Sequence, residues 1–179
     1  MDKIELLAPA GNAECLVAAV QSGADAVYLS GKNFGARSFA DNFDNAGLEK
    51  AADYCHLRNV RIHVTVNTLV SDAELGDIKD YILFLNKIGV DAVIVQDLGI
   101  ADVIKSISPE LPVHASTQMT VHNADGVRFA ESLGMSRVVL SRELSLSEIK
   151  KISEETAAEL EVFGHGALCM CYSGQCLMS

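Results

Sequence analysis

The stretch Val60-Arg-Ile-His-Val-Thr-Val66, followed by Ala73–Lys87 and by Ala92-Val-Ile-Val95, decides the fold. Its first and last segments are short runs of branched apolar residues, which are typical of buried strands. The middle segment has the period of an amphipathic helix and ends at Gly89. A strand, a helix and a second strand in this order form a right-handed crossover between parallel neighbours. The stretch therefore predicts one unit of a parallel α/β sheet.

The same unit recurs along the 179 residues of the chain. Further strand-like runs lie at Ile4–Ala8, Ala26–Leu29, Val113–Ser116, Val138–Ser141 and Leu160–Phe163. Helical patterns cover Ala13–Gln21, Ala46–Leu57, Gly99–Ser106, Asn123–Ser132 and Ser145–Glu155. No Gly-x-Gly-x-x-Gly motif follows the first strand, so a nucleotide-binding fold is not favoured. About seven regularly spaced strands predict a (β/α)₈ TIM-like barrel that is incomplete here, because a full barrel typically needs about 250 residues.

Composition narrows the class of protein. The formal net charge of −10 argues against a simple nucleic-acid-binding module, so any contact with RNA is not expected to use a basic face. No run approaches the roughly 18 apolar residues that a membrane span needs, and no signal-peptide pattern precedes the first strand. Cysteines that do not suggest disulfide pairs favour a reducing cytoplasm. A cytoplasmic globular protein without membrane contact is expected.

The last stretch, Glu161–Ser179, begins as a strand and breaks at Gly164 and Gly166 into a turn-rich segment with three cysteines. Thiols gathered just past a strand suggest metal ligation or a reactive site more than core packing. Their spacing does not fit the usual zinc patterns. A flexible Ser-Gly turn separates Cys169 from Cys176 and lets both reach one larger cluster. Cys171 is expected to alternate away from Cys169 and is interpreted as a bystander, with a reactive thiol as the alternative.

The same run carries a family resemblance. Its motifs His165-Gly-Ala-Leu-Cys169 and Tyr172-Ser-Gly-Gln-Cys176-Leu-Met-Ser179 resemble the signature of peptidase family U32, a collagenase-like family. Further matching segments lie at Leu6–Gly11, Gly23–Tyr28, Ser116–Gln118 and Arg137–Leu144, so the resemblance covers in effect the whole chain. It implies that residues 1–179 are the N-terminal part of a single U32-type barrel domain whose C-terminal remainder is missing here.

The resemblance implies chemistry beyond peptide cleavage. Relatives include proteins of oxygen-independent hydroxylation that act on a ubiquinone precursor, on a tRNA wobble uridine or on ribosomal RNA. In those relatives four cysteines hold a 4Fe-4S cluster, and prephenate is implicated as hydroxyl donor. By motif position Cys169 and Cys176 match the first two ligands, and the other two lie beyond Ser179. We therefore expect an iron-sulfur-dependent RNA hydroxylation enzyme, with the cluster present in the full-length protein and absent or incomplete in these residues alone.

Polar side chains stand at the ends of the predicted strands, where barrel enzymes carry their active sites. His165 and Arg142 are the predicted catalytic residues, and the guanidinium fork of Arg142 suits a dicarboxylate such as prephenate, although pairing with Glu143 is an equal alternative. The predicted substrate-binding residues are Asn67, Gln118, Arg37 and Gln96. Arg37 belongs to a connection that is long enough for a lid.

Other polar or sulfur-bearing residues have structural interpretations. His63, His114 and Glu161 lie deep in predicted strands, where a hydrogen-bonded core network is the simpler expectation. Cys15 and Cys55 fall on predicted helices and are interpreted as small buried hydrophobes. No function is predicted for His56 or His122.

Two alternatives to the hydroxylase remain open. One is a collagenase-like U32 peptidase, in which Cys169 would be the nucleophile and His165 its base, because a thiol needs a nearby base. The other is a non-catalytic binding or assembly module. The first and seventh strands would leave open barrel edges, which favour a dimer or strand exchange unless something covers them.

Overall fold

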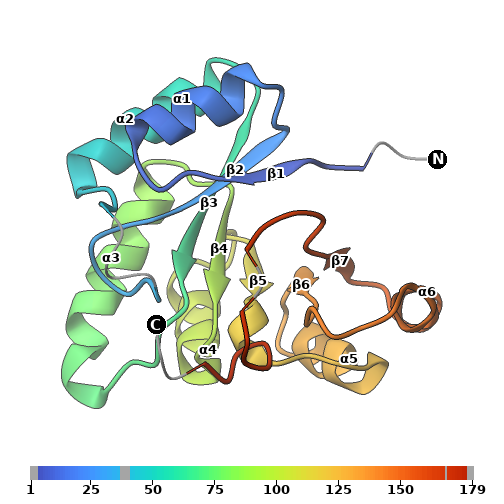
Figure 1. Cartoon of the computed structure of the whole chain (residues 1–179). Helices are drawn as coiled ribbons and strands as arrows, with labels where there is room; N and C mark the ends of the chain where they lie inside the picture. Colours follow the sequence, from blue (N-terminus) through green and yellow to red (C-terminus); the bar gives the residue numbers. More distant parts are fainter. Residues whose placement is uncertain (1–3, 37–40, 168, 177–179) are drawn as a thin grey trace.

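Seven parallel strands form one curled sheet in the computed structural model, which describes residues 4–36, 41–167 and 169–176 (Figure 1). The strands are β1 (Leu7–Pro9), β2 (Ala26–Ser30), β3 (Arg61–Val66), β4 (Ala92–Val95), β5 (Val113–Ala115), β6 (Arg137–Val139) and β7 (Glu159–Glu161). Their order in the sheet follows the sequence, and each strand pairs in parallel with the next. The prediction of about seven strands in an incomplete barrel is confirmed.

Helices fill the connections between these strands. They are α1 (Ala13–Gln21), α2 (Asn45–His56), α3 (Leu75–Lys87), α4 (Leu98–Ile107), α5 (Ala124–Ser132) and α6 (Leu146–Glu155), with short 3-10 turns η1 (Asp72–Glu74) and η2 (Thr117–Met119). Most begin at a polar cap soon after a strand: Asn12, Asp44, Asp97, Asn123 and Ser145 each accept a backbone N–H of the first turn. These caps stabilise the helix starts at the rim formed by the strands' C-terminal ends.

The last strand is displaced from its predicted position. It spans Glu159–Glu161 rather than Leu160–Phe163. Its ladder ends where the N–H of Leu140 donates to the carbonyl of Glu161, at 2.9 Å. Val162 and Phe163 are each 50% exposed, so the apolar residues that suggested a longer strand already belong to the segment leaving the sheet.

Branched apolar side chains fill the core between the sheet and the helices. Ile62 and Val64 of β3 are fully buried, as are Ile78, Ile82 and Leu85 of α3. Cys55 of α2 is buried as predicted, but Cys15 of α1 is exposed, because it lies off the buried face carried by Leu16 and Val20. The core therefore lies between the sheet and the helices that cover it, and leaves the polar rim residues available for other contacts.

Ion pairs occupy the N-terminal end of the sheet. Arg137 of β6, with 9% of its side chain exposed, donates to Glu5 at 2.6 Å and to Glu159 of β7 at 2.5 Å. Arg61 of β3 also pairs with Glu5. Glu5, which precedes β1, is thereby connected to β3 and, through Arg137, to β6 and β7.

The prediction that His63, His114 and Glu161 form a hydrogen-bonded core network is wrong in part. His63 and His114 are 1% and 6% exposed, and their rings meet edge to face with centroids 4.9 Å apart. However, Nδ1 of each ring has no hydrogen-bond partner among the described residues, and neither has Oε2 of Glu161. Glu161 only approaches Nη1 of Arg137, at 3.7 Å. At the two Nδ1 atoms, packing and the ring contact take the place of the expected hydrogen bonds.

Strands β1 and β7 are the two ends of the sheet order. Pairing with another chain through these edges stays a prediction. Within the described ranges, no helix has the length and apolar character that crossing a bilayer requires.

Candidate functional site

Three cysteines meet in residues 169–176, here called the thiol loop. The Sγ atoms of Cys169, Cys171 and Cys176 all lie within 4.8 Å of one another. The proximity of Cys169 and Cys176 is as predicted, but Cys171 joins them instead of alternating away. The prediction for Cys171 was wrong because residues two apart share one face of an extended backbone, so Cys169 and Cys171 lie on the same side. A tight turn, closed by a 3.0 Å bond from the N–H of Gln175 to the carbonyl of Tyr172, follows them and precedes Cys176. The site therefore offers three thiols.

One backbone hydrogen bond inside the loop is directed at a cysteine sulfur. The N–H of Cys171 points at Sγ of Cys169, 3.4 Å away. A hydrogen bond with the Cys176 thiol and the charge of that thiol raise the pKa of Cys171, and burial and then Cys169 act in the same direction. No cysteine forms a disulfide, and all five lie in the described part of the chain. A soft cation would relieve the crowding by neutralising the thiolates, which are its preferred ligands.

The thiol loop is attached to the rim at the ends of β5 and β6. In Figure 1 the red segment after β7 turns back across this end of the sheet. Nη1 of Arg142 donates to the carbonyl of Cys169 at 3.2 Å, and Nη2 donates to the carbonyl of Cys171 at 2.7 Å. Arg142 was predicted to be catalytic; in the structure its guanidinium binds the backbone of the loop. A catalytic role for Arg142 stays a prediction.

Ser173, which is 4% exposed, is the buried anchor of the loop. Its N–H donates to Oε1 of Glu143 at 3.0 Å, and its Oγ accepts the N–H of Arg142 at 3.1 Å. Its carbonyl accepts from Oγ1 of Thr120 at 3.1 Å, and Thr120 in turn accepts from the side chain of Gln175 at 3.0 Å. Ser173 thus joins the loop to both β5 and β6.

Glu143 also faces His122, for which no role was predicted. Nε2 of His122 lies 3.4 Å from Oε2 of Glu143, while Nδ1 lies 2.9 Å from the carbonyl of Thr120. Burial opposes ionisation of Glu143, but hydrogen bonds from its own N–H and from Ser173 outweigh it and lower the pKa of Glu143. The carboxylate is therefore a negative acceptor beneath the loop.

Gly174 fits where no other residue would. Its φ of +76° is in the left-handed region, and a Cβ at this position would lie 2.7 Å from the carbonyl oxygen of Gln118. The loop backbone therefore lies directly on the segment that follows β5. This close approach explains why the motif has glycine at position 174.

The predicted substrate residues divide into two places. Gln96 and Gln118 line the same open cleft of about 730 Å³, which Leu69, Met119 and Phe129 also line. Asn67 instead bridges two strand ends: Oδ1 accepts the N–H of Ala36 at 3.0 Å and Nδ2 donates to Oγ of Ser116 at 3.4 Å. Arg37 lies outside the described residues.

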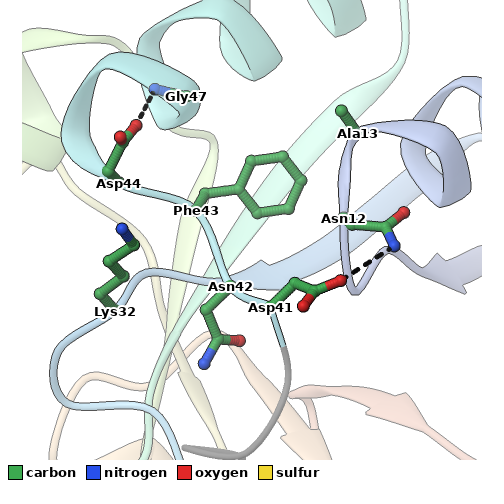
Figure 2. Close-up of a pocket in the computed structure, with 8 residues that line it drawn as sticks. All are labelled: Asn12, Ala13, Lys32, Asp41, Asn42, Phe43, Asp44 and Gly47. Carbon is green, nitrogen blue, oxygen red and sulfur yellow. Dashed lines mark hydrogen bonds between the residues drawn. The ribbon is translucent and has the colours of Figure 1, made fainter.

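A second, smaller pocket of about 250 Å³ lies between the starts of α1 and α2 (Figure 2). Asn12 donates to Asp41 across it at 3.5 Å, and Asp44 accepts the N–H of Gly47 at 2.8 Å. Lys32 also lines it. Because Asp44 caps α2 and Asp41 binds Asn12, the carboxylates of this pocket already have structural partners.

Sequence comparison identifies the family of this chain. The profile of peptidase family U32 matches residues 11–179, which include the whole thiol loop. The chain belongs to peptidase family U32. The family resemblance suggested by the cysteine motif is thereby confirmed.

Curated relatives of this U32 chain have more than one kind of name. It is 40% identical over 177 residues to tRNA hydroxylation protein P1 of Bacillus subtilis and 41% identical over 177 residues to a 23S rRNA 5-hydroxycytidine synthase of Escherichia coli. Both alignments include 99% of this chain but only 42% and 26% of the relatives. A Porphyromonas gingivalis protein named collagenase is 35% identical over 192 residues, which cover 45% of it. The U32 chain thus spans less than half of each.

Solved structures support the fold. The U32 peptidase Mk0906 superposes with a TM-score of 0.76 at 17% identity, covering 89% of this chain and 68% of that one. Phosphonopyruvate hydrolase superposes with a TM-score of 0.63 at 14% identity, covering 89% and 66%. At these identities the likeness concerns the arrangement of strands and helices alone.

His165, the other predicted catalytic residue of this U32 chain, is exposed and makes no hydrogen bond or ion pair with another described residue. A cysteine peptidase needs its base within hydrogen-bond reach of the nucleophile and a third group to orient that base. The described residues provide neither contact for Cys169. Both the catalytic role of His165 and the peptidase alternative stay predictions.

Proposed function

We propose that this chain is part of an enzyme that hydroxylates RNA without oxygen, and that its thiol loop provides ligands to an iron-sulfur cluster. The observation that carries the proposal is the meeting of three cysteine sulfurs within 4.8 Å at the C-terminal end of a parallel sheet. Active sites of such barrels lie at this end. The two relatives with the highest identities reported above are both named for RNA hydroxylation, one of tRNA and one of rRNA.

The donor set fits an iron-sulfur cluster. Thiolates are the usual ligands of these clusters, and a backbone N–H directed at a ligating sulfur is one of the ways in which proteins tune them. Cys169 and Cys176 would hold the cluster, with Cys171 beside them and the N–H of Cys171 directed at the sulfur of Cys169. A bound cluster supplies one-electron redox chemistry that protein side chains lack.

The neighbouring cleft is the proposed place for the base. Gln96 and Gln118 offer amide donors and acceptors on its wall, while Met119 and Phe129 offer apolar surface. Nucleobases are recognised by this combination of hydrogen bonds to their edges and contact with their faces. Thr120 connects the cleft to the thiol loop, because it lines the cleft and hydrogen bonds to Ser173.

Prephenate is the proposed hydroxyl donor. Arg142 has five N–H donors, and the loop carbonyls occupy two of them, so the guanidinium can still donate to a carboxylate. The side chain is 20% exposed, which leaves part of it accessible. Arg142 would then hold the loop and one end of the dicarboxylate at once.

A replacement experiment tests the activity. The 177 residues of the Bacillus subtilis protein that align with this chain would be exchanged for it, and the hybrid expressed in cells that lack that protein. We expect hydroxylated tRNA nucleosides to return, as measured by mass spectrometry, and to disappear with Cys169→Ser or Cys176→Ser but not with Cys15→Ser. A folded hybrid that leaves tRNA unmodified and cleaves gelatin would overturn the proposal in favour of the peptidase.

A further inference from the structure

The rim contacts the thiol loop mainly at its backbone, and also at the side chains of Ser173 and Gln175. Contacts from the rim fall on alternate residues: the carbonyls of Cys169 and Cys171, the N–H, Oγ and carbonyl of Ser173, and the side chain of Gln175. Two consecutive residues after β6, Arg142 and Glu143, make most of these contacts. They are called the rim clasp below.

Arg142 sets the spacing between two of the cysteines. Its two Nη atoms are a rigid planar pair, and they bind carbonyls that are two residues apart in the loop. Met170, between them, is fully exposed, so packing of that side chain does not fix this turn. A lysine carries its charge at one point and cannot reproduce a forked contact with two carbonyls.

Glu143 fixes the next turn of the loop. Its Oε1 accepts both the N–H of Ser173, at 3.0 Å, and Oγ of Ser173, at 3.4 Å. The same carboxylate faces His122 at 3.4 Å and Nη2 of Arg142 at 3.7 Å. Glu143 therefore contacts a residue after β5, its neighbour Arg142 after β6, and Ser173 of the loop.

From this arrangement we propose that Arg142 and Glu143 are positioning residues that bring the three thiols together before any metal binds. The inference rests on the proposed thiol site and goes beyond it by naming the residues that organise it. Groups that orient metal ligands without touching the metal typically change metal affinity by about 10- to 100-fold when they are removed. The rim clasp is expected to act in this range.

Cadmium titration of the whole chain tests the proposal, because Cd²⁺ is a soft ion that reports thiolate ligation by an ultraviolet charge-transfer band. We expect wild type to bind one Cd²⁺, and Arg142→Ala and Glu143→Ala each to bind it about 10- to 100-fold more weakly. Arg142→Lys should recover only part of the loss, because it restores charge without the fork. Arg128→Ala is the matched control, since Arg128 makes its ion pairs with Asp125 of α5 and Glu155 of α6, neither of which belongs to the thiol loop or the rim clasp.

The outcomes separate the two proposals. Loss of the band in Cys169→Ser and Cys176→Ser supports the thiol site, whereas a wild type without the band overturns the site itself. If wild type binds Cd²⁺ and Arg142→Ala binds it equally well, the positioning role is wrong and the thiol site stands. Far-UV circular dichroism and thermal unfolding identify a variant that has lost its fold. In that case the Cd²⁺ affinities of Arg142→Lys and Glu143→Gln decide the question, because these substitutions keep the shape of the side chain more closely.

Discussion

Protonation of the buried pair His63 and His114 should make stability strongly dependent on pH. Burial, and then the nearby charge of Arg137, lower the pKa of His63 from its ordinary 6.5 to about 4, although Glu5 and Asp91 act in the opposite direction. Burial, followed by the charges of His63, Arg137 and Arg61, lowers the pKa of His114 from 6.5 to about 3. Both rings are therefore neutral in the folded protein near neutral pH.

The direction of the change in stability with pH follows from which state of the protein binds more protons. Below pH 6.5 the unfolded chain binds a proton at each histidine while the folded chain does not, so stability is lost as the pH falls from 6.5 toward the folded pKa values. Between about pH 7.5 and about pH 5.5 the loss comes to slightly more than about 1 kcal/mol for each histidine, or between about 2 and 3 kcal/mol for the pair. Typical domains have only about 5–15 kcal/mol in total.

Urea unfolding followed by circular dichroism, repeated across this pH range, measures the effect. The double variant His63→Leu with His114→Leu should lose between about 2 and 3 kcal/mol less than wild type over the same interval. Glu161 works in the opposite sense, because burial raises the pKa of Glu161, and comparing two proteins that both contain it removes its contribution. Equal slopes for wild type and the double variant would refute the reasoning.

Three further outcomes are expected. Arg137→Ala should destabilise the fold by about 3–5 kcal/mol in urea unfolding, because it leaves the largely buried Glu161 without its cation and Glu5 paired with Arg61 alone. Arg61→Ala, whose side chain is 53% exposed, should lose about 1 kcal/mol or less, and equal losses would contradict this account. Gly174→Ala should weaken Cd²⁺ binding while Gly164→Ala does not, since only Gly174 combines positive φ with a neighbouring backbone. In Cys176→Ser the alkylation of Cys171, followed by mass spectrometry, should move to lower pH, because Cys176 is the first cause of the raised pKa of Cys171; an unchanged profile would show that the two thiols are not coupled.

Local sequence patterns predict the strands of this fold well, because burial on both faces of a parallel sheet selects uninterrupted branched residues. Val93 and Val95 of β4 are fully buried, and their run is predicted to the residue. Helix α1 is likewise predicted to the residue, since Asn12 caps its start and Gly23 follows its end. Where apolar residues continue beyond the last pairing bond, as at Val162 and Phe163, the same rule extends the strand too far.

The site is less predictable because its contacts join distant segments. Cys171 lies two residues from Cys169 and therefore shares its side of an extended segment, whereas Cys176 reaches them only through the turn closed between Tyr172 and Gln175. His122 gains significance only through Glu143, 21 residues later, which the sequence cannot place beside it. Cys15 was expected to be buried because its residue type usually is, but the helix turns it outward. In each case a tertiary contact, or its absence, outweighs a local preference.

Because the rim binds the loop mainly through backbone atoms, a cysteine substitution should remove a metal ligand without changing the shape of the loop. In a site whose fold depends on its ligands, replacing one ligand unfolds the surrounding segment, and loss of metal then has two explanations. Here the rim clasp binds carbonyls and Ser173, so Cys169→Ser leaves those hydrogen bonds in place. The loop should therefore keep its shape when a thiol is lost and lose its shape when Arg142 is lost. Limited proteolysis distinguishes the two: cleavage near Met170 should increase in Arg142→Ala and remain at the wild-type rate in Cys169→Ser. Equal cleavage of both variants would mean that the thiols, and not the rim, organise the loop.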